Sequence, residues 1–137
     1  MYLLDTNVIS ELRRPRPNAS VLAWLSEAAP EQIFIAAVTF GELQAGVEMT
    51  RRQDVEKAAA IEGWIDSVAA SYSIIAADEA IFRRWARLMH RRSDDLIEDA
   101  MIAATALVRN MTVVTRNLRD FVEFSVPVLN PFDTGGR

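Results

Sequence analysis

The first fourteen residues, MYLLDTNVISELRR (1–14), place an acidic side chain between a short apolar segment and an amphipathic one. Residues 2–4 predict a buried strand, and residues 7–14 predict a helix that the following prolines end. Asp5 therefore lies where a strand gives way to a helix. Ligands bind at the carboxyl ends of the strands in an open parallel sheet, so Asp5 is a candidate site residue. It is equally suited to cap the following helix.

The rest of the chain alternates further predicted strands and helices. The predicted strands cover residues 33–35, 73–75, 112–115 and 126–129, the last near a sheet edge because Pro127 interrupts it. The predicted helices begin near Asn18 or Ser20 and then cover residues 39–48, 54–70, 78–91 and 96–108. This alternation predicts an α/β sandwich with a mostly parallel sheet of four to five strands. We expect a single domain over residues 1–132 and a disordered tail over residues 133–137.

Composition excludes several classes of protein. The apolar stretches fall far short of the ~18 residues that span a bilayer, and the start lacks a basic segment typical of a signal peptide. We therefore expect a cytoplasmic protein that does not associate with membranes. The sequence has no cysteine, which excludes disulfides, thiol catalysis and cysteine-bound zinc. His90 lies among arginines at a predicted helix end, where dipole stabilisation or exposure is favoured over catalysis.

The net charge of −4 bears on the choice of partner. A negative total ordinarily argues against nucleic acid, because phosphate binding depends on basic surface. Acids gathered around a divalent cation, however, do not repel phosphate once the metal is bound. Lys57 is the only lysine among the basic residues. Arginine suits bidentate phosphate contact, although an arginine-rich composition can equally reflect genomic base composition.

Glu42 follows the second predicted strand, in the segment TFGEL (39–43). The spacing is that of a capping box, with Thr39 as the N-cap and Glu42 reaching back to its backbone N–H. A site carboxylate is the alternative. Both interpretations place Glu42 in the first turn of a helix, facing the same sheet edge as Asp5.

The segment DDLIEDAMIAAT (94–105) holds four acids. Asp94, Asp95 and Glu98 are explained by the favourable interaction of acids with the first turn of a helix. Asp99 falls on the side of the helix that packs inward, where an unpaired carboxylate is costly. A cation would neutralise it.

A polar turn follows the fourth predicted strand, again at a carboxyl end. Thr115, Asn117 and Asp120 supply oxygen atoms as ligands or hydrogen-bond donors, and Arg116 is a candidate for phosphate contact or for a solvated surface position. Carboxylates that meet at one sheet edge predict a site for Mg²⁺, and Mn²⁺ would also fit. Such an ion activates water and offsets phosphoryl charge, which favours metal-assisted phosphodiester hydrolysis.

Four segments carry a resemblance across nearly the whole chain. They are LLDTNVISELRRPRPN (3–18), TFGELQAGV (39–47), DAMIAATALVRNMTVVTRN (99–117) and VPVLNPF (126–132). In this order and spacing they resemble the PIN-domain ribonucleases, specifically the VapC toxins of bacterial type II toxin–antitoxin pairs and their FitB-like branch. The resemblance implies a three-layer PIN-like sandwich and a Mg²⁺- or Mn²⁺-dependent endoribonuclease. It also implies a VapB- or FitA-like antitoxin, an RNA substrate and a homodimer that joins a larger assembly with the antitoxin.

The family pattern assigns catalytic, metal-binding roles to Asp5, Glu42 and Asp99, which leaves Thr6 and Asn7 as the helix caps. A fourth family acid often follows the fourth strand, where FitB-like members tend to read TRD. This chain reads Thr115-Arg116-Asn117. We therefore expect one tightly held metal ion, with Asn117 bonded to metal-bound water and Asp120 supplying the missing charge.

Two other functions compete with this interpretation. A haloacid-dehalogenase-like phosphatase also begins with a strand and an aspartate, but it needs a second acid where this chain has Asn7. A non-catalytic module would keep the fold and bind RNA or protein without cutting it. The missing fourth acid favours that module, and the retention of Asp5, Glu42 and Asp99 opposes it.

Overall fold

The computed structural model describes residues 1–132 and contains a five-stranded sheet. The strands are β1 (Tyr2–Leu4), β2 (Ile33–Ala36), β3 (Ser73–Ile75), β4 (Thr112–Val114) and β5 (Val128–Leu129). Their order across the sheet is β3-β2-β1-β4-β5, and every neighbouring pair is parallel. All five strands therefore end at the same edge of the sheet, and β5 lies at one side of it, as its proline predicts.

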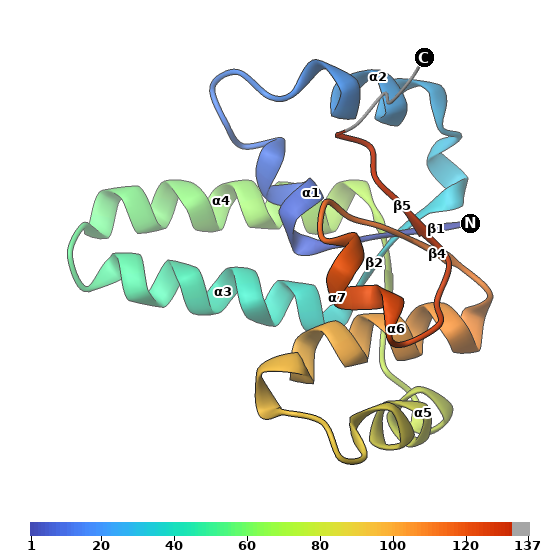
Figure 1. The fold of residues 1–137 in the computed structure, drawn as a ribbon. Helices are drawn as coiled ribbons and strands as arrows, with labels where there is room; N and C mark the ends of the chain where they lie inside the picture. The colour runs from blue at the N-terminus through green and yellow to red at the C-terminus, as the bar shows by residue number, and fades with distance from the viewer. Residues whose placement is uncertain (133–137) are drawn as a thin grey trace.

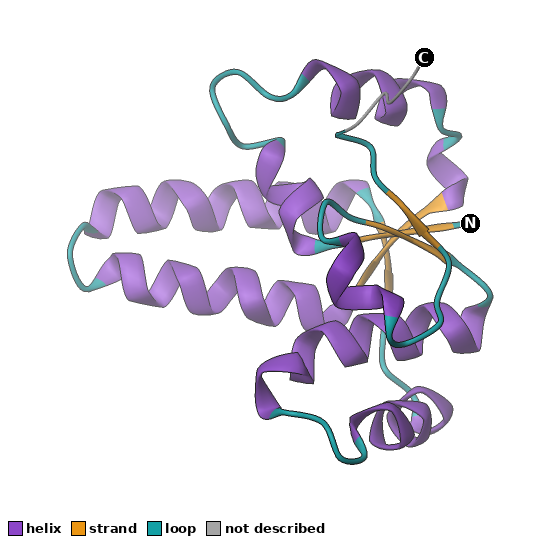
Figure 2. Ribbon diagram, viewed as in Figure 1, coloured by secondary structure: helices purple, strands orange, loops and turns teal. Residues whose placement is uncertain are grey.

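Helices cover both faces of this sheet (Figures 1 and 2). They are α1 (Thr6–Glu11), α2 (Ala19–Glu27), α3 (Ala37–Arg51), α4 (Val55–Ser71), α5 (Glu79–Met89), α6 (Ile97–Arg109) and α7 (Leu118–Val122), with 3₁₀ turns η1 (Pro30–Gln32) and η2 (Asp94–Leu96). Figure 1 shows α3 and α4 side by side as a hairpin that projects from the sheet, with α5 and α6 on one side of the molecule and α2 on the other. None of the helices within residues 1–132 is both long and apolar enough to cross a lipid bilayer.

Each face of the sheet has its own core. Successive strand side chains point to opposite faces, and Leu3 accordingly packs with α5, α6 and α7, whereas Leu4 packs with α1, α2 and α4. Val113 and Val114 divide in the same way. The alanines of α6 are fully buried and allow that helix to lie close against β1 and β4. The α/β sandwich with a parallel sheet is confirmed.

The start of α3 differs from the predicted capping box. The helix begins at Ala37, directly after β2, and its N-cap is Ala36, which has an extended backbone and no capping side chain. Thr39 is inside the helix and fully buried, and its hydroxyl finds no partner among residues 1–132. Glu42 therefore lies in the second turn, not the first. Two small alanines at the junction let the strand turn into the helix without the intervening residue that the capping box requires.

Other differences are smaller. The first helix ends at Glu11 and not at residue 14, and the next three N–H groups, of residues 12–14, bond to carbonyls three residues earlier, as in tight turns. The buried Glu11 carboxylate accepts a hydrogen bond from the Asn18 N–H at 2.8 Å. A short helix, α7, occupies what the sequence predicts as a turn. The predicted tail at residues 133–137 lies outside the described residues, and the single domain over residues 1–132 stays a prediction.

Candidate active site

Asp5 is both the N-cap of α1 and a member of a hydrogen-bond network at the carboxyl edge of the sheet. Its side chain is nearly buried, at 4% exposure. Oδ1 accepts the Thr6 backbone N–H at 2.8 Å. Oδ2 accepts the Thr115 hydroxyl at 2.8 Å and the Asn7 amide at 3.1 Å. The prediction that Thr6 and Asn7 replace Asp5 as the caps is wrong, since one carboxylate serves the helix and faces the sheet edge.

Asn7 and Thr115 join α1 to the segment that follows β4. The Thr115 hydroxyl donates to Asp5 and accepts hydrogen bonds from the Asn7 side-chain amide at 3.1 Å and the Asn117 N–H at 2.9 Å. These three bonds use the whole capacity of a hydroxyl. The side-chain oxygen of Asn7, Oδ1, also accepts a hydrogen bond from the Arg116 backbone N–H at 3.1 Å. The network therefore holds Asp5 in one orientation.

Glu42 reaches the same region from α3, which packs against both α1 and α6. Its Oε1 accepts the Thr6 hydroxyl at 3.1 Å. Burial, the largest cause, and the charges of Glu98, Asp5 and Asp99 together raise the pKa of Glu42 to about 7, against the lowering effect of the Thr6 hydrogen bond. Glu42 is thus close enough to three other carboxylates for their charges to act on it.

Asp99 lies in the first turn of α6 and is half-buried. Burial, the largest cause, and then the charges of neighbouring acids together raise the pKa of Asp99 to about 6; in decreasing order of effect these acids are Asp5, Asp120, Glu98 and Asp95. Burial also raises the pKa of Asp5, helped by Asp120 and opposed by the three hydrogen bonds. We call Asp5, Glu42, Asp99 and Asp120 the acidic cluster, because the charges of Asp5, Asp99 and Asp120 each raise the pKa of another member and the pKa of Glu42 is raised by two of them.

The chemistry of the acidic cluster fits Mg²⁺. Across residues 1–132, no group of three or more histidine, aspartate or glutamate side chains is arranged to hold a metal ion as it stands. Mg²⁺ does not require such a cage, because it keeps several waters and is commonly held by one or two carboxylates together with substrate phosphate. Mg²⁺ prefers oxygen ligands, which the carboxylates of the cluster supply. A bound cation would also relieve the repulsion between these carboxylates.

The remaining predicted site residues lie around the cluster. Arg116 is exposed, and its guanidinium lies 3.8 Å above the centre of the Phe132 ring. Asn117 is also exposed and precedes α7, without a capping hydrogen bond from its side chain. Asp120 lies in the first turn of α7 and is half-buried.

A groove of about 320 Å³ opens beside the cluster. Thr6 and Arg13 line it from the α1 side, Glu42 and Thr50 from α3, and Trp64 from α4. Because Glu42 belongs to both the groove and the acidic cluster, a molecule lying in this groove would contact the cluster.

Two contributors escape the sequence analysis. Glu98 is assigned there to the helix dipole, yet its charge acts on both Glu42 and Asp99. Phe132 stacks on Arg116 from a segment that reads only as the end of an edge strand. The effect of Glu98 on Glu42 and the contact of Phe132 with Arg116 leave no signal in residue spacing, since both depend on how distant segments pack.

Comparison with known proteins identifies the family. The family model for the PIN domain matches residues 2–126. The chain belongs to the PIN-domain family. Among relatives of this PIN domain, Toxin FitB of Neisseria gonorrhoeae is 34% identical over 96% of this chain and 99% of its own length. VapC ribonuclease Y4jK of Sinorhizobium fredii is 31% identical over 97% of this chain and 99% of its own length.

Solved structures agree with this assignment. The PIN domain superposes on a chain of the FitAB complex bound to an IR36 DNA fragment with a TM-score of 0.85 and 32% identity, covering 100% of this chain and 99% of that one. A chain of the FitAcB structure from Neisseria gonorrhoeae gives 0.84 and 34%, covering 96% and 99%. The resemblance to FitB-like VapC toxins is therefore confirmed.

Proposed function

We propose that this PIN domain is the toxin of a type II toxin–antitoxin pair and cleaves RNA as a Mg²⁺- or Mn²⁺-dependent endoribonuclease. The observation that carries the proposal is the acidic cluster: its carboxylates come from four separate segments, and the charges of neighbouring members raise the pKa of Asp5, Glu42 and Asp99. Relatives named as toxins and ribonucleases support the same activity. We also propose the cytoplasm as its site of action.

In this proposal Asp5, Glu42 and Asp99 hold one divalent ion. Asp120 supplies the negative charge that is missing because Asn117 stands where many family members have an acid. A bound Mg²⁺ supplies a water of lowered pKa and offsets charge on the phosphoryl oxygens. Thr115 and Asn7 keep the Asp5 carboxylate in a fixed orientation by their hydrogen bonds.

Thr6 holds Glu42 toward the same space. Arg116 is exposed and stacks on Phe132, so its guanidinium is available to a substrate phosphate. The hydrogen-bonded residues of the site thus orient Asp5 and Glu42, and the arginine provides a contact for RNA.

The proposed partners follow from the solved relatives. FitAB and VapBC structures are complexes of toxins with antitoxins, some bound to DNA. We assign this chain a VapB- or FitA-like antitoxin and a homodimeric toxin unit within the larger assembly. The charge of −4 does not oppose an RNA substrate, because part of the negative charge belongs to the acidic cluster.

The test is cleavage of total cellular RNA by the purified, antitoxin-free protein with Mg²⁺, with Mn²⁺ and with a chelator. We expect discrete products with either metal, none with the chelator, and none from Asp99→Asn. Equal cleavage by the wild type and Asp99→Asn would overturn the proposal. Binding of RNA without cleavage under every condition would favour the non-catalytic module, for which the neutral Asn117 is the one argument in the site.

A further inference from the structure

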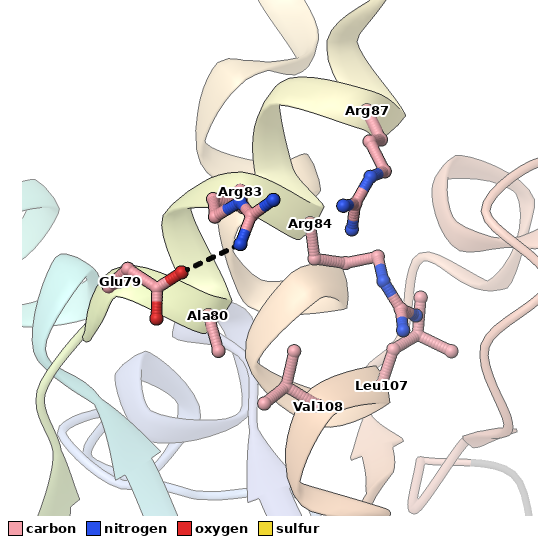
Figure 3. Close-up of a pocket in the computed structure, with 7 residues that line it drawn as sticks. All are labelled: Glu79, Ala80, Arg83, Arg84, Arg87, Leu107 and Val108. Carbon is pink, nitrogen blue, oxygen red and sulfur yellow. Dashed lines mark hydrogen bonds and ion pairs between the residues drawn. The ribbon is translucent and has the colours of Figure 1, made fainter.

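A second charged feature lies on helices α5 and α6. Arg83, Arg84 and Arg87 of α5 and Leu107 and Val108 of α6 line a pocket of about 390 Å³ (Figure 3). We call it the arginine pocket. Figure 3 shows Arg84 extending toward Leu107, with the Arg87 guanidinium pointing to the same side of α5. The acidic cluster uses none of these residues.

Two of the three arginines in the arginine pocket have no acidic partner within residues 1–132. Arg83 pairs with Glu79 at 3.1 Å, and both side chains are exposed. Arg84 and Arg87 form no ion pair with any acid in residues 1–132. Arg83 and Arg87 are four residues apart on one helix, and like charges at that spacing destabilise a helix. A bound anion would relieve this repulsion.

Packing against α6 also fixes the position of one of the arginines in the pocket. Arg84 is half-buried, and its side chain lies along the apolar wall that α6 provides. An arginine stem packed on apolar surface keeps its guanidinium at the water boundary. The planar guanidinium matches the oxygens of a phosphate in a bidentate contact. The pocket thus combines a positioned guanidinium with a second one a helical turn away.

Helix α6 links the arginine pocket to the acidic cluster. It carries Asp99 in its first turn and Leu107 two turns later. Eight residues of α-helix correspond to about 12 Å along the axis. An extended strand of a few phosphates, at about 3.4 Å each, is therefore long enough to span the stretch of α6 between Asp99 and Leu107.

We propose that the arginine pocket binds the phosphate backbone of RNA away from the bond that is cut. The RNA identity rests on the proposed function. An acidic protein segment would also pair with guanidinium, but RNA is favoured because its phosphates repeat regularly along the chain and the same polymer must reach the acidic cluster. The pocket contributes affinity that does not depend on base sequence, since phosphate contacts carry no sequence information.

The experiment measures binding of a fluorescein-labelled oligouridylate by anisotropy, with the full chain in chelator so that no RNA is cut. The variant is Arg84→Gln/Arg87→Gln. The matched control, Arg16→Gln/Arg52→Gln, removes the same charge from exposed positions in the α1–α2 loop and at the α3–α4 turn. Thermal unfolding establishes that both variants fold.

We expect the pocket variant to bind about tenfold more weakly and its salt slope to fall by about 1.4, because each phosphate contact on a single strand contributes about 0.7. The control should change affinity by less than about twofold, with an unchanged slope. Arg84→Lys/Arg87→Lys keeps the charge and should retain the slope while losing part of the affinity, since lysine lacks the bidentate fork.

Equal weakening in pocket and control variants would overturn the proposal, as would an unchanged affinity in the pocket variant. A pocket variant that binds oligouridylate normally but no longer retains a co-purified antitoxin would assign the pocket to an acidic protein segment instead. Cleavage by the wild type with Mg²⁺ is scored separately. If binding depends on the pocket but no RNA is cut, the nuclease proposal fails and the pocket proposal stands. If RNA is cut but binding does not depend on the pocket, the pocket proposal fails and the nuclease proposal stands.

Discussion

Asp5 and Asp99 are both carboxylates at the same sheet edge, yet the protein treats them differently. Asp5 accepts three hydrogen bonds, from Thr6, Asn7 and Thr115, which lower its pKa and oppose the effect of burial. No hydrogen bond within residues 1–132 lowers the pKa of Asp99, which only burial and neighbouring acids affect. Asp5 is therefore held in a fixed orientation by the protein, whereas the carboxylate of Asp99 is left for a positive group from outside the chain. The two acids of the proposed metal site differ in hydrogen bonding as well as in burial.

The largest expected effect separates the two acids by stability. Asp5→Ala should lower the free energy of unfolding by about 2–3 kcal/mol, because it leaves the nearly buried Thr115 hydroxyl and Thr6 N–H without their acceptor. Asp99→Asn should leave the metal-free protein as stable as the wild type or more so, since it removes repulsion. Urea unfolding in chelator measures both. Similar losses from the two substitutions would remove the distinction.

An intermediate effect concerns pH. Folding raises the pKa of Glu42 from 4.5 to about 7 and that of Asp99 from 3.8 to about 6. The folded protein then binds more protons than the unfolded chain, so this stabilisation is complete below the unfolded pKa values and is lost as pH rises to about 7. We expect the metal-free protein to melt at a higher temperature near pH 5 than near pH 8.

The control for this prediction is Glu42→Gln/Asp99→Asn, which should flatten the dependence between those pH values. Added Mg²⁺ should stabilise the wild type more near pH 8 than near pH 5, because ligands must be deprotonated to bind. A wild-type melting temperature that rises steadily from pH 5 to pH 8 in chelator would contradict the raised pKa values.

The smallest expected effect concerns Asp120, which we propose compensates for the neutral Asn117. The charge of Asp120 raises the pKa of Asp99 and Asp5, so Asp120→Asn should shift the acidic limb of the pH–rate profile to lower pH. We expect cleavage at neutral pH to fall less than about tenfold. Asn117→Asp in the same chain should restore the original profile by returning one negative charge. Complete loss of cleavage in Asp120→Asn would instead make Asp120 an indispensable ligand.

Local pattern was sufficient for most of the elements. Residues 2–4 form a strand as predicted, because a short apolar run bounded by polar residues suits a buried parallel strand. Capping chemistry was less reliable. The TFGE segment has the spacing of a capping box, but α3 starts two residues earlier, because the strand before it turns directly into the helix. Residue spacing shows which side chains are able to cap a helix, but it does not show at which residue the helix begins.

The sequence by itself determined the class of the fold and the acids available at strand ends, because both depend on periodicity and on the rule that parallel strands share one carboxyl edge. Only the tertiary structure decided what each acid does there. Thr115 lies 110 positions from Asp5 in sequence, yet its hydroxyl holds that carboxylate. Hydrogen bonds and charge interactions act over a few ångströms in space, so the distinction between a held and an unheld carboxylate exists only once distant segments have packed together.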